Sequence, residues 1–283
     1  MRDPMLRLRP AAGMLLAAAL LLTLAACGGG GEETAPPAGD APAADAGDAA
    51  APTPADLEAG NDAVAALRTG SATVSGTVTY AGEVPTLQPI QMGADPACQA
   101  KYDGPVYPET IELGDGNTMA HIFISVKGGL AAATYSAPTA PAVFDQEGCR
   151  YHPHVMGVLA GQPLAFLNSD GLLHNVHGLP KANREFNLGM PANITQARVP
   201  HELNTPEPLF PVKCDVHPWM QSYVAVMTHP YFDVTATDGA YTLDGLPPGS
   251  YEIEAWHERL GTQTQTVTVA DGESATADFE FTR

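Results

Sequence analysis

The chain has 283 residues, and its 32 acidic side chains outnumber its 13 lysines and arginines, giving a net charge of −19 at pH 7. A protein so acidic repels phosphate groups, which excludes nucleic acids and anionic lipid surfaces as partners. The acidity is uneven, because residues 142–230 carry seven acidic and five basic side chains and are close to neutral.

The N-terminus has the pattern of an export signal. Three arginines precede an apolar run over residues 11–24, which is too short for a transmembrane helix. The run ends in Leu-Ala-Ala-Cys, which resembles a bacterial lipobox, so residues 1–26 are predicted to be a lipoprotein signal peptide and Cys27 to carry the lipid. The alternative is an ordinary signal peptide that happens to contain a cysteine.

This interpretation predicts a lipid-anchored protein of the cell envelope that faces the periplasm or the cell surface. The anchor would be its only contact with the membrane, and Gly28 after the cysteine favours the outer membrane. Residues 27–70 are rich in Ala, Pro, Gly and acidic side chains and hold too little bulky apolar surface to offset the entropy of folding. They are predicted to be a disordered tether, with a weak helical pattern over 56–69.

From residue 71 onward, apolar and polar side chains alternate in short segments separated by turns that contain Gly or Pro. This pattern predicts an all-β fold built from sandwiches or barrels. A folded region of about 210 residues exceeds one small sandwich, so two domains are expected. The clearest predicted strands cover residues 73–80, 121–126, 155–159, 164–167, 221–227, 240–243, 251–255 and 264–269.

The most informative motif is Cys-Asp-Val-His-Pro-Trp-Met over residues 214–220. It places a thiolate, an imidazole and a thioether on one short loop, and these groups are the ligands of redox-active copper. A second imidazole is needed, and His174 is the strongest candidate. Methionine is a poor zinc ligand, which argues against a structural zinc site. The alternative without metal is a buried cysteine, a surface histidine and a core methionine.

Several motifs in residues 142–230 together resemble the cupredoxin family. They are Tyr-His-Pro-His at 151–154, the apolar segment 164–167, His-Asn-Val-His at 174–177 and the loop 214–220. The loop has two residues between Cys and His and two between His and Met, which is most similar to the amicyanin type; plastocyanin-type loops generally have a longer second gap. The resemblance implies a Greek-key β-sandwich and one type 1 copper per chain, held by His174, Cys214, His217 and Met220.

The same resemblance implies roles for the neighbours of the ligands. Asn175 would hydrogen-bond to the backbone beside Cys214 and lock the two ligand loops together. Asp215 stands where the family often has Ser or Thr, and it would either lower the reduction potential or bond to Asn175. Pro218 would stiffen the loop, and with Trp219 it would surround the exposed edge of His217, the usual electron port in the family.

Other histidines leave a second metal site open. His152 and His154 are two residues apart, so on one strand they would share a face. Together with His177 they would form a second site, as in two-copper enzymes. The plainer alternative is a set of surface or hydrogen-bonded histidines on one sheet.

The cysteine count divides in a simple way. With Cys27 assigned to lipid and Cys214 to metal, Cys98 and Cys149 remain, and an oxidising compartment favours a disulfide between them. The alternative is two separate buried thiols, or Cys149 as a metal ligand.

The C-terminal segment 232–251, with its Asp-Gly turn and Leu-Pro-Pro-Gly-Ser-Tyr, resembles the carboxypeptidase regulatory-like domain, a transthyretin-like β-sandwich. Its usual opening strand, which contains Gly-Thr-Val, is found far upstream at residues 76–78. We therefore expect residues 71–141 and 231–283 to form the two halves of one sandwich, with the cupredoxin of residues 142–230 inserted between them. The alternative is a cupredoxin with extra N-terminal strands, followed by a partial module.

These features favour an electron-transfer protein that shuttles single electrons between transient redox partners and catalyses no reaction. A second hypothesis is copper storage or delivery, although delivery sites usually have Met-rich or His-rich tracts and the nine methionines here are dispersed. A third is a copper enzyme with a second metal site. A sandwich that binds carbohydrate or protein and has lost its copper is the remaining alternative.

Overall fold

The computed structural model describes residues 54–199 and 201–283. The predicted signal peptide, Cys27 and most of the predicted tether lie outside the described residues. None of the described helices is long and apolar enough to cross a membrane.

The described chain is mainly β-structure, as its alternating pattern predicted. It contains the helices α1 (Pro54–Ala65) and α2 (Pro96–Gln99), and short 3-10 helices at Met92–Ala94, Glu109–Ile111 and Asp115–Asn117. The strands are β1 (Ala72–Tyr80), β2 (Phe123–Gly128), β3 (Ala142–Glu147), β4 (Arg150–His152), β5 (Val155–Leu159), β6 (Leu164–Asn168), β7 (His174–Gly178), β8 (Phe186–Met190), β9 (Gln196–Arg198), β10 (Glu207–Lys213), β11 (Gln221–Met227), β12 (Phe232–Val234), β13 (Ala240–Leu246), β14 (Gly249–His257), β15 (Gly261–Val269), β16 (Ser274–Thr276) and β17 (Phe279–Phe281).

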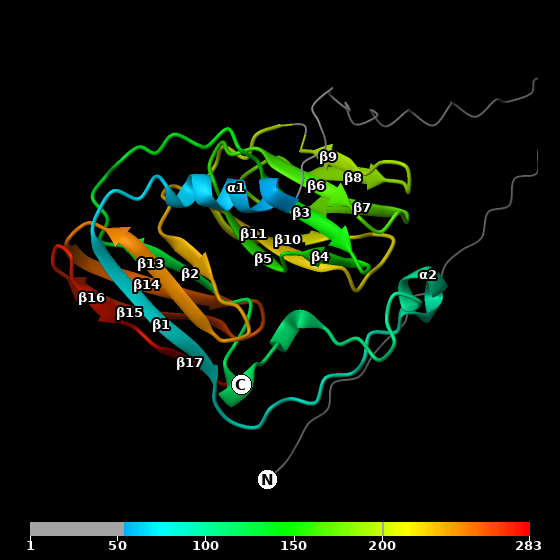
Figure 1. Ribbon diagram of the computed structural model, residues 1–283, viewed down its shortest axis with the longest axis horizontal. Helices are drawn as coiled ribbons and strands as arrows, with labels where there is room; N and C mark the ends of the chain where they lie inside the picture. Colours follow the sequence, from blue (N-terminus) through cyan, green and yellow to red (C-terminus); the bar gives the residue numbers. More distant parts are fainter. Residues whose placement is uncertain (1–53, 200) are drawn as a thin grey trace, which may run out of the picture. The chain divides into compact units, whose positions relative to one another are not determined.

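The strands from β3 to β11 form two sheets around one core (Figure 1). One sheet has the order β5-β11-β10-β7-β8, and the other has the order β4-β3-β6-β9. Their inward side chains form a single buried cluster that includes Phe144, Phe166, Val176, Val212 and Val224. Each of these large apolar groups gains roughly 1.5–3 kcal/mol on leaving water, which makes this cluster the main source of stability of the sandwich.

The remaining strands come from both ends of the described chain and form a second pair of sheets. In one sheet β1 pairs with β13, β16 and β17; in the other the order is β12-β2-β14-β15. Val78 and Ile124, from before the first sandwich, share a buried cluster with Leu243, Ile253 and Phe279, which follow it. The strands within residues 72–128 and those within 232–281 therefore share one core and form a second sandwich. The chain between them contains the first sandwich, β3 to β11.

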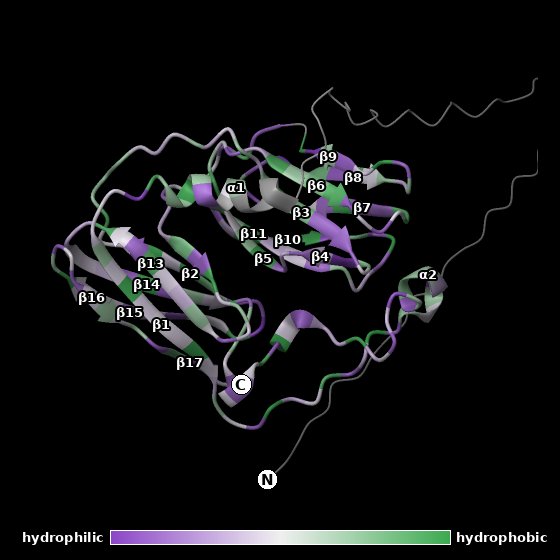
Figure 2. Cartoon of the chain, in the orientation of Figure 1, coloured by the Kyte–Doolittle hydropathy of each residue, from purple (hydrophilic) through white to green (hydrophobic). Residues whose placement is uncertain are grey.

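The two sandwiches meet at β5. A side chain at Gly157 would place its Cβ 2.6 Å from the ring of Phe232 and 2.9 Å from that of Phe123, so only glycine fits there. The two rings themselves stack with centroids 5.7 Å apart. Figure 2 shows hydrophobic and hydrophilic residues interspersed along the strands, as expected for sheets with one buried face.

All eight predicted strands are present, and the predictions for 155–159 and 221–227 match β5 and β11 residue for residue. The predicted strand 121–126 begins two residues later, since His121 has φ +63°, which a strand does not accommodate. The weak helical pattern over 56–69 corresponds to α1, which begins and ends earlier.

Candidate metal centre

The three predicted ligands His174, Cys214 and His217 come together at one end of a sheet. His174 is the first residue of β7, while the loop 214–220 connects β10 to β11. Because β10 lies between β7 and β11, this end of the sheet brings the loop beside His174. All three side chains and that of Met220 are buried, with His217 only 1% exposed.

The donor atoms converge. Nδ1 of His174 lies 2.9 Å from Nδ1 of His217, and Sγ of Cys214 lies 3.9 Å from the same nitrogen of His217. One donor atom from each of the three residues lies within 4.8 Å of the others. Two imidazoles, a thiol and a thioether are the donors that copper selects, and Met220 belongs to the same buried cluster as Cys214. The residues present therefore fit a copper ion.

Backbone hydrogen bonds hold the ligand loop in shape. The amide of Cys214 donates to the carbonyl of Met220 over 3.1 Å, and the amide of Met220 donates to the carbonyl of His217 over 2.9 Å. The amide of His217 also points at Sγ of Cys214, 3.4 Å away. These hydrogen bonds all lie within residues 214–220, so they close the loop that carries three of the four predicted ligands.

Asn175 joins the two ligand segments. Its Oδ1 accepts a hydrogen bond of 2.7 Å from the backbone amide of Asp215, and its Nδ2 donates to Oδ2 of Asp215 over 3.1 Å. The Asp215 carboxylate also lies 2.8 Å from Nδ1 of His177 and 3.1 Å from Nζ of Lys213. Of the two roles open to Asp215, the structure shows the bond to Asn175. Its hydrogen-bond donors, Lys213 first, lower the pKa of Asp215 to about 2.

Before any metal binds, the electrostatics shift the pKa of Cys214 downward and that of His174 upward. Burial raises the pKa of Cys214, but the hydrogen bond with His174 and nearby backbone amides outweigh it and bring that pKa below its usual value. Burial likewise lowers the pKa of His174, yet its bonds to Asp170 and Cys214 raise it to about 9. Metal binds to the thiolate and to neutral imidazole, so a copper ion would take the place of the proton on His174.

Asp170 is a central residue that the sequence analysis did not identify. Its side chain is fully buried, and Oδ2 lies 2.9 Å from Nε2 of His174. The carboxylate also accepts hydrogen bonds of 2.7 Å from the amides of Gly148 and Cys149 and pairs with Nζ of Lys101 at 2.8 Å. Burial raises the pKa of Asp170, but these four donors together lower it to about 2. A charged carboxylate therefore orients the imidazole of His174.

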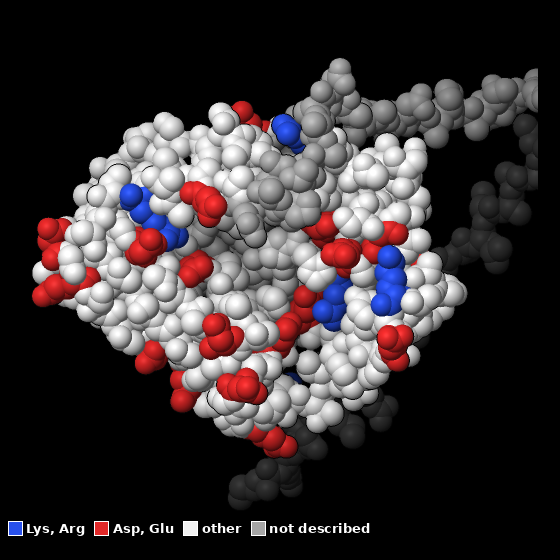
Figure 3. Space-filling view, viewed as in Figure 1, with Lys and Arg blue, Asp and Glu red and all other residues white. Residues whose placement is uncertain are grey.

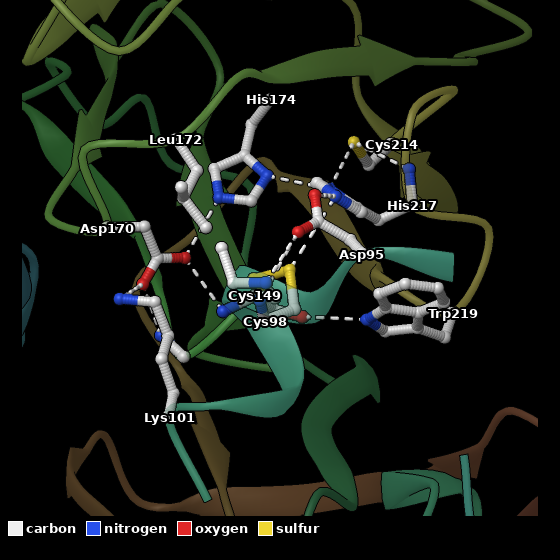
Figure 4. The surroundings of a disulfide bond; sticks show 12 residues. Asp95, Cys98, Lys101, Cys149, Asp170, Leu172, His174, Cys214, His217 and Trp219 are labelled. Carbon is white, nitrogen blue, oxygen red and sulfur yellow. Dashed lines mark hydrogen bonds and ion pairs between the residues drawn. A yellow bond between two sulfur atoms is a disulfide. The ribbon is translucent and has the colours of Figure 1, made fainter. Parts of the chain in front are cut away.

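The outer edge of His217 is covered by a distant segment. Its Nε2 lies 3.0 Å from Oδ2 of Asp95 and 3.6 Å from Sγ of Cys98 (Figure 4). Cys98 and Cys149 form a disulfide with a Cα–Cα distance of 5.7 Å. The ring of Trp219 packs 5.1 Å from that of His217, and its Nε1 donates to the carbonyl of Cys149 over 3.1 Å. The expectation that the edge of His217 is exposed is therefore wrong, because residues that precede the first sandwich bury it.

The candidate second site of His152, His154 and His177 is not brought together. Strand β4 ends at His152 and β5 begins at Val155, so the first two histidines do not share one strand face. His154 instead lies 2.8 Å from Glu258, whereas His177 lies between Asp215 and Glu185. Within the described residues, no metal-compatible group of donor atoms contains any of these three histidines.

Comparisons with known proteins concern separate parts of the chain. Residues 224–282 match the family model of the carboxypeptidase regulatory-like domain. No curated protein matches the chain.

Among solved structures, the Cu(I) form of the M51A mutant of amicyanin is 24% identical, with a TM-score of 0.27, covering 38% of this chain and 99% of its own. A purple cupredoxin from Nitrosopumilus maritimus is 19% identical, with a TM-score of 0.26, and the match covers 30% of this chain and 98% of that protein. A copper-containing nitrite reductase from Thermus scotoductus SA-01 is 16% identical, with a TM-score of 0.29, covering 35% of this chain, which spans only 25% of that enzyme. The chain is thus similar in part to amicyanin and other cupredoxins, at low identity, and in part to the carboxypeptidase regulatory-like domain, the two resemblances expected from its sequence.

Proposed function

We propose that this protein is a copper protein of the bacterial envelope that passes single electrons between transient redox partners. The observation that carries the proposal is the convergence of three buried side chains: His174 at the start of β7, and Cys214 and His217 in the closed loop that also contains Met220. A copper ion held by these residues would supply a one-electron couple.

The residues around the donors favour electron transfer because they resist movement. Both histidines are held through their outer nitrogens by carboxylates, Asp170 for His174 and Asp95 for His217. Asn175 fixes the ligand loop to β7. A site whose ligands are held by such outer contacts changes geometry little between oxidation states, which lowers the cost of each transfer.

Storage or delivery of copper is the second candidate. Delivery needs ligands that exchange with a partner, whereas all four predicted ligands are at most 2% exposed. An enzyme is the third candidate, and it would need a second metal. Bound copper above one per chain would favour the enzyme, and rapid loss of copper to a chelator would favour delivery.

The location is part of the proposal and rests on the sequence. The basic and apolar start of the chain and its Leu-Ala-Ala-Cys motif support export and lipidation at Cys27. Among the charged side chains on the face shown in Figure 3, acidic ones are more common than basic ones, which fits contact with the membrane through a lipid alone. Metabolic labelling with a radioactive fatty acid tests this: the label should enter the wild-type chain and be lost in Cys27→Ser.

The function is tested by loading Cu(II) into the chain purified without residues 1–26 and with Cys27→Ser. An intense visible band and a type 1 EPR spectrum are expected, with one copper per chain, and both should disappear in Cys214→Ser. Met227→Leu, at the end of β11 outside the loop, is the control and should leave both unchanged. A colourless protein, or a spectrum that does not depend on Cys214, would contradict the proposal.

A further inference from the structure

The edge of His217 is covered by a short segment that we call the strap, residues 91–102. The strap lies in the long connection between β1 and β2, strands that belong to the second sandwich, and it contains α2. It nevertheless packs on the predicted copper site. Four described contacts fasten it there: the Cys98–Cys149 disulfide, Lys101 with Asp170, the Tyr102 hydroxyl with the carbonyl of Gly148, and Asp95 with His217.

Asp95 is oriented by its own helix. It is the N-cap residue of α2, and its Oδ1 accepts hydrogen bonds from the amides of Ala97 at 2.9 Å and Cys98 at 3.4 Å. The other oxygen, Oδ2, is thereby free to reach Nε2 of His217, 3.0 Å away (Figure 4). The position of the carboxylate is set by α2, and α2 is tied to the first sandwich by the disulfide one turn later.

Burial of the Asp95 side chain does not account for its contact with His217. The Asp95 side chain is 34% exposed, so burial does not force it against the histidine. Cys98 supplies the neighbouring apolar contact, with Sγ 3.6 Å from Nε2. His217 thus has one nitrogen facing His174 and Cys214 and the other fully engaged by the strap.

We propose that Asp95 is a positioning residue of the copper centre, and that the strap closes the histidine edge against redox partners. This inference rests on the proposed function. A carboxylate on the outer nitrogen of a ligand histidine fixes the ring and makes the metal-facing nitrogen a stronger donor. The stronger donor and the added negative charge stabilise Cu(II) more than Cu(I), so Asp95 lowers the reduction potential.

Two variants distinguish the effect of the negative charge of Asp95 from the effect of covering the edge of His217. Asp95→Asn keeps one oxygen, which caps α2, but it removes the charge and puts an amide nitrogen in place of the oxygen that faces Nε2. Asp95→Ala removes the cap, the hydrogen bond and the charge. The control is Asp103→Asn, which removes the same charge just beyond the strap, at an exposed residue for which the structure shows no hydrogen bond or ion pair.

Loss of such an outer contact typically changes metal affinity by about 10- to 100-fold. Because Asp95 is partly exposed, we expect a change in metal affinity near the lower limit of this range. A tenfold selective loss for Cu(II) is a rise in potential of about 59 mV for one electron. We expect this rise in both Asp95 variants. Electron self-exchange, measured from NMR line broadening in mixtures of the two oxidation states, should become at least tenfold faster in Asp95→Ala alone, while Asp103→Asn leaves both properties unchanged.

An NMR measurement on the metal-free protein tests the contact between Asp95 and His217 without copper. The Nε2 proton of His217 should give a slowly exchanging imidazole resonance in the wild type, because Oδ2 of Asp95 accepts from it, and it should exchange faster in both Asp95 variants, which lack that acceptor. If the wild type binds no copper as a type 1 site, the proposed function fails while this resonance still tests the contact. If the wild type has that site but both Asp95 variants match Asp103→Asn in potential and exchange rate, the inference is overturned.

Discussion

Two clusters of histidines and carboxylates in this molecule look alike in composition but differ in how their nitrogens are used. In the first, the outer nitrogens of His174 and His217 face carboxylates and their Nδ1 atoms face each other across 2.9 Å. In the second, near the contact of the two sandwiches, Nδ1 of His154 lies 3.1 Å from the carbonyl of Gln221 and Nε2 lies 2.8 Å from Glu258. Only the first leaves nitrogens directed at a shared point.

The carboxylates of the second cluster are also engaged by other groups. Glu258 lies 3.0 Å from the hydroxyl of Tyr223 in addition to His154, and Glu109 pairs with Arg150 at 3.5 Å. Glu109, Glu112 and His121 do have donor atoms within 4.8 Å of one another, but the Nε2 of His121 is already bonded to Glu112 at 3.0 Å. The comparison shows that a residue count does not define a metal centre; what matters is which donor atoms remain directed at one another.

The largest expected effect comes from the first cluster. Asp170→Asn removes a fully buried charge that holds both His174 and Lys101. Breaking a buried ion pair typically costs about 3–5 kcal/mol. Because Lys101 is 30% exposed and can regain water, we expect a loss near the lower limit, about 3 kcal/mol, in the free energy of unfolding of the metal-free protein measured with urea.

Lys101→Met separates the two partners of Asp170. It removes the cation on the exposed side and leaves the contact with His174, so it should cost clearly less than Asp170→Asn. Equal losses for the two variants would show that Asp170 serves the strap and not the histidine, which would weaken the contrast between the clusters.

The disulfide gives the next largest effect. The double variant Cys98→Ala/Cys149→Ala opens a bridge between residues 51 positions apart, and a bridge of this kind stabilises a fold by about 2–4 kcal/mol. The copper spectrum should persist, since none of the four predicted ligands lies in the strap. Chemical denaturation and the visible spectrum measure the two outcomes. Loss of copper binding would instead show that the bridged strap is required to hold the metal.

Much of the first cluster could be predicted from local sequence. The spacing of Cys214, His217 and Met220 defines the loop, and a histidine at the start of a strand completes it. Asp170 had a local signal too, since it stands four residues before His174 in the same segment, and carboxylates commonly orient ligand histidines.

Asp95 could not be found in this way. It lies 122 positions from His217, and the contact depends on how the connection between β1 and β2 crosses to the other sandwich. The sequence does carry an N-cap signal, Asp95 before Pro96, but that signal predicts only a helix start. The exposed edge assigned to His217 came from the cupredoxin resemblance, which covers residues 142–230 and does not include the strap.

The smallest expected effect tests the second cluster. Burial raises the pKa of Glu258, but its hydrogen bonds with His154 and Tyr223 outweigh this and lower it below its ordinary value. A lowered pKa means that the folded state favours the carboxylate, so the stabilisation is complete above the pKa of the unfolded chain and is lost as pH falls through the folded value. Glu258→Gln should therefore cost about 1.5–3 kcal/mol at pH 7, the range of a bond to a charged group.

The same variant has a pH signature and a copper signature. The difference in unfolding free energy between wild type and Glu258→Gln should shrink as the pH falls from the ordinary glutamate pKa of about 4.3 through the lower pKa of Glu258 in the folded state. Copper content and spectrum should stay as in the wild type, because Glu258 bonds to His154 and not to a predicted ligand. A change in copper stoichiometry would show that the second cluster binds metal, and the distinction drawn from the engaged nitrogens would fail.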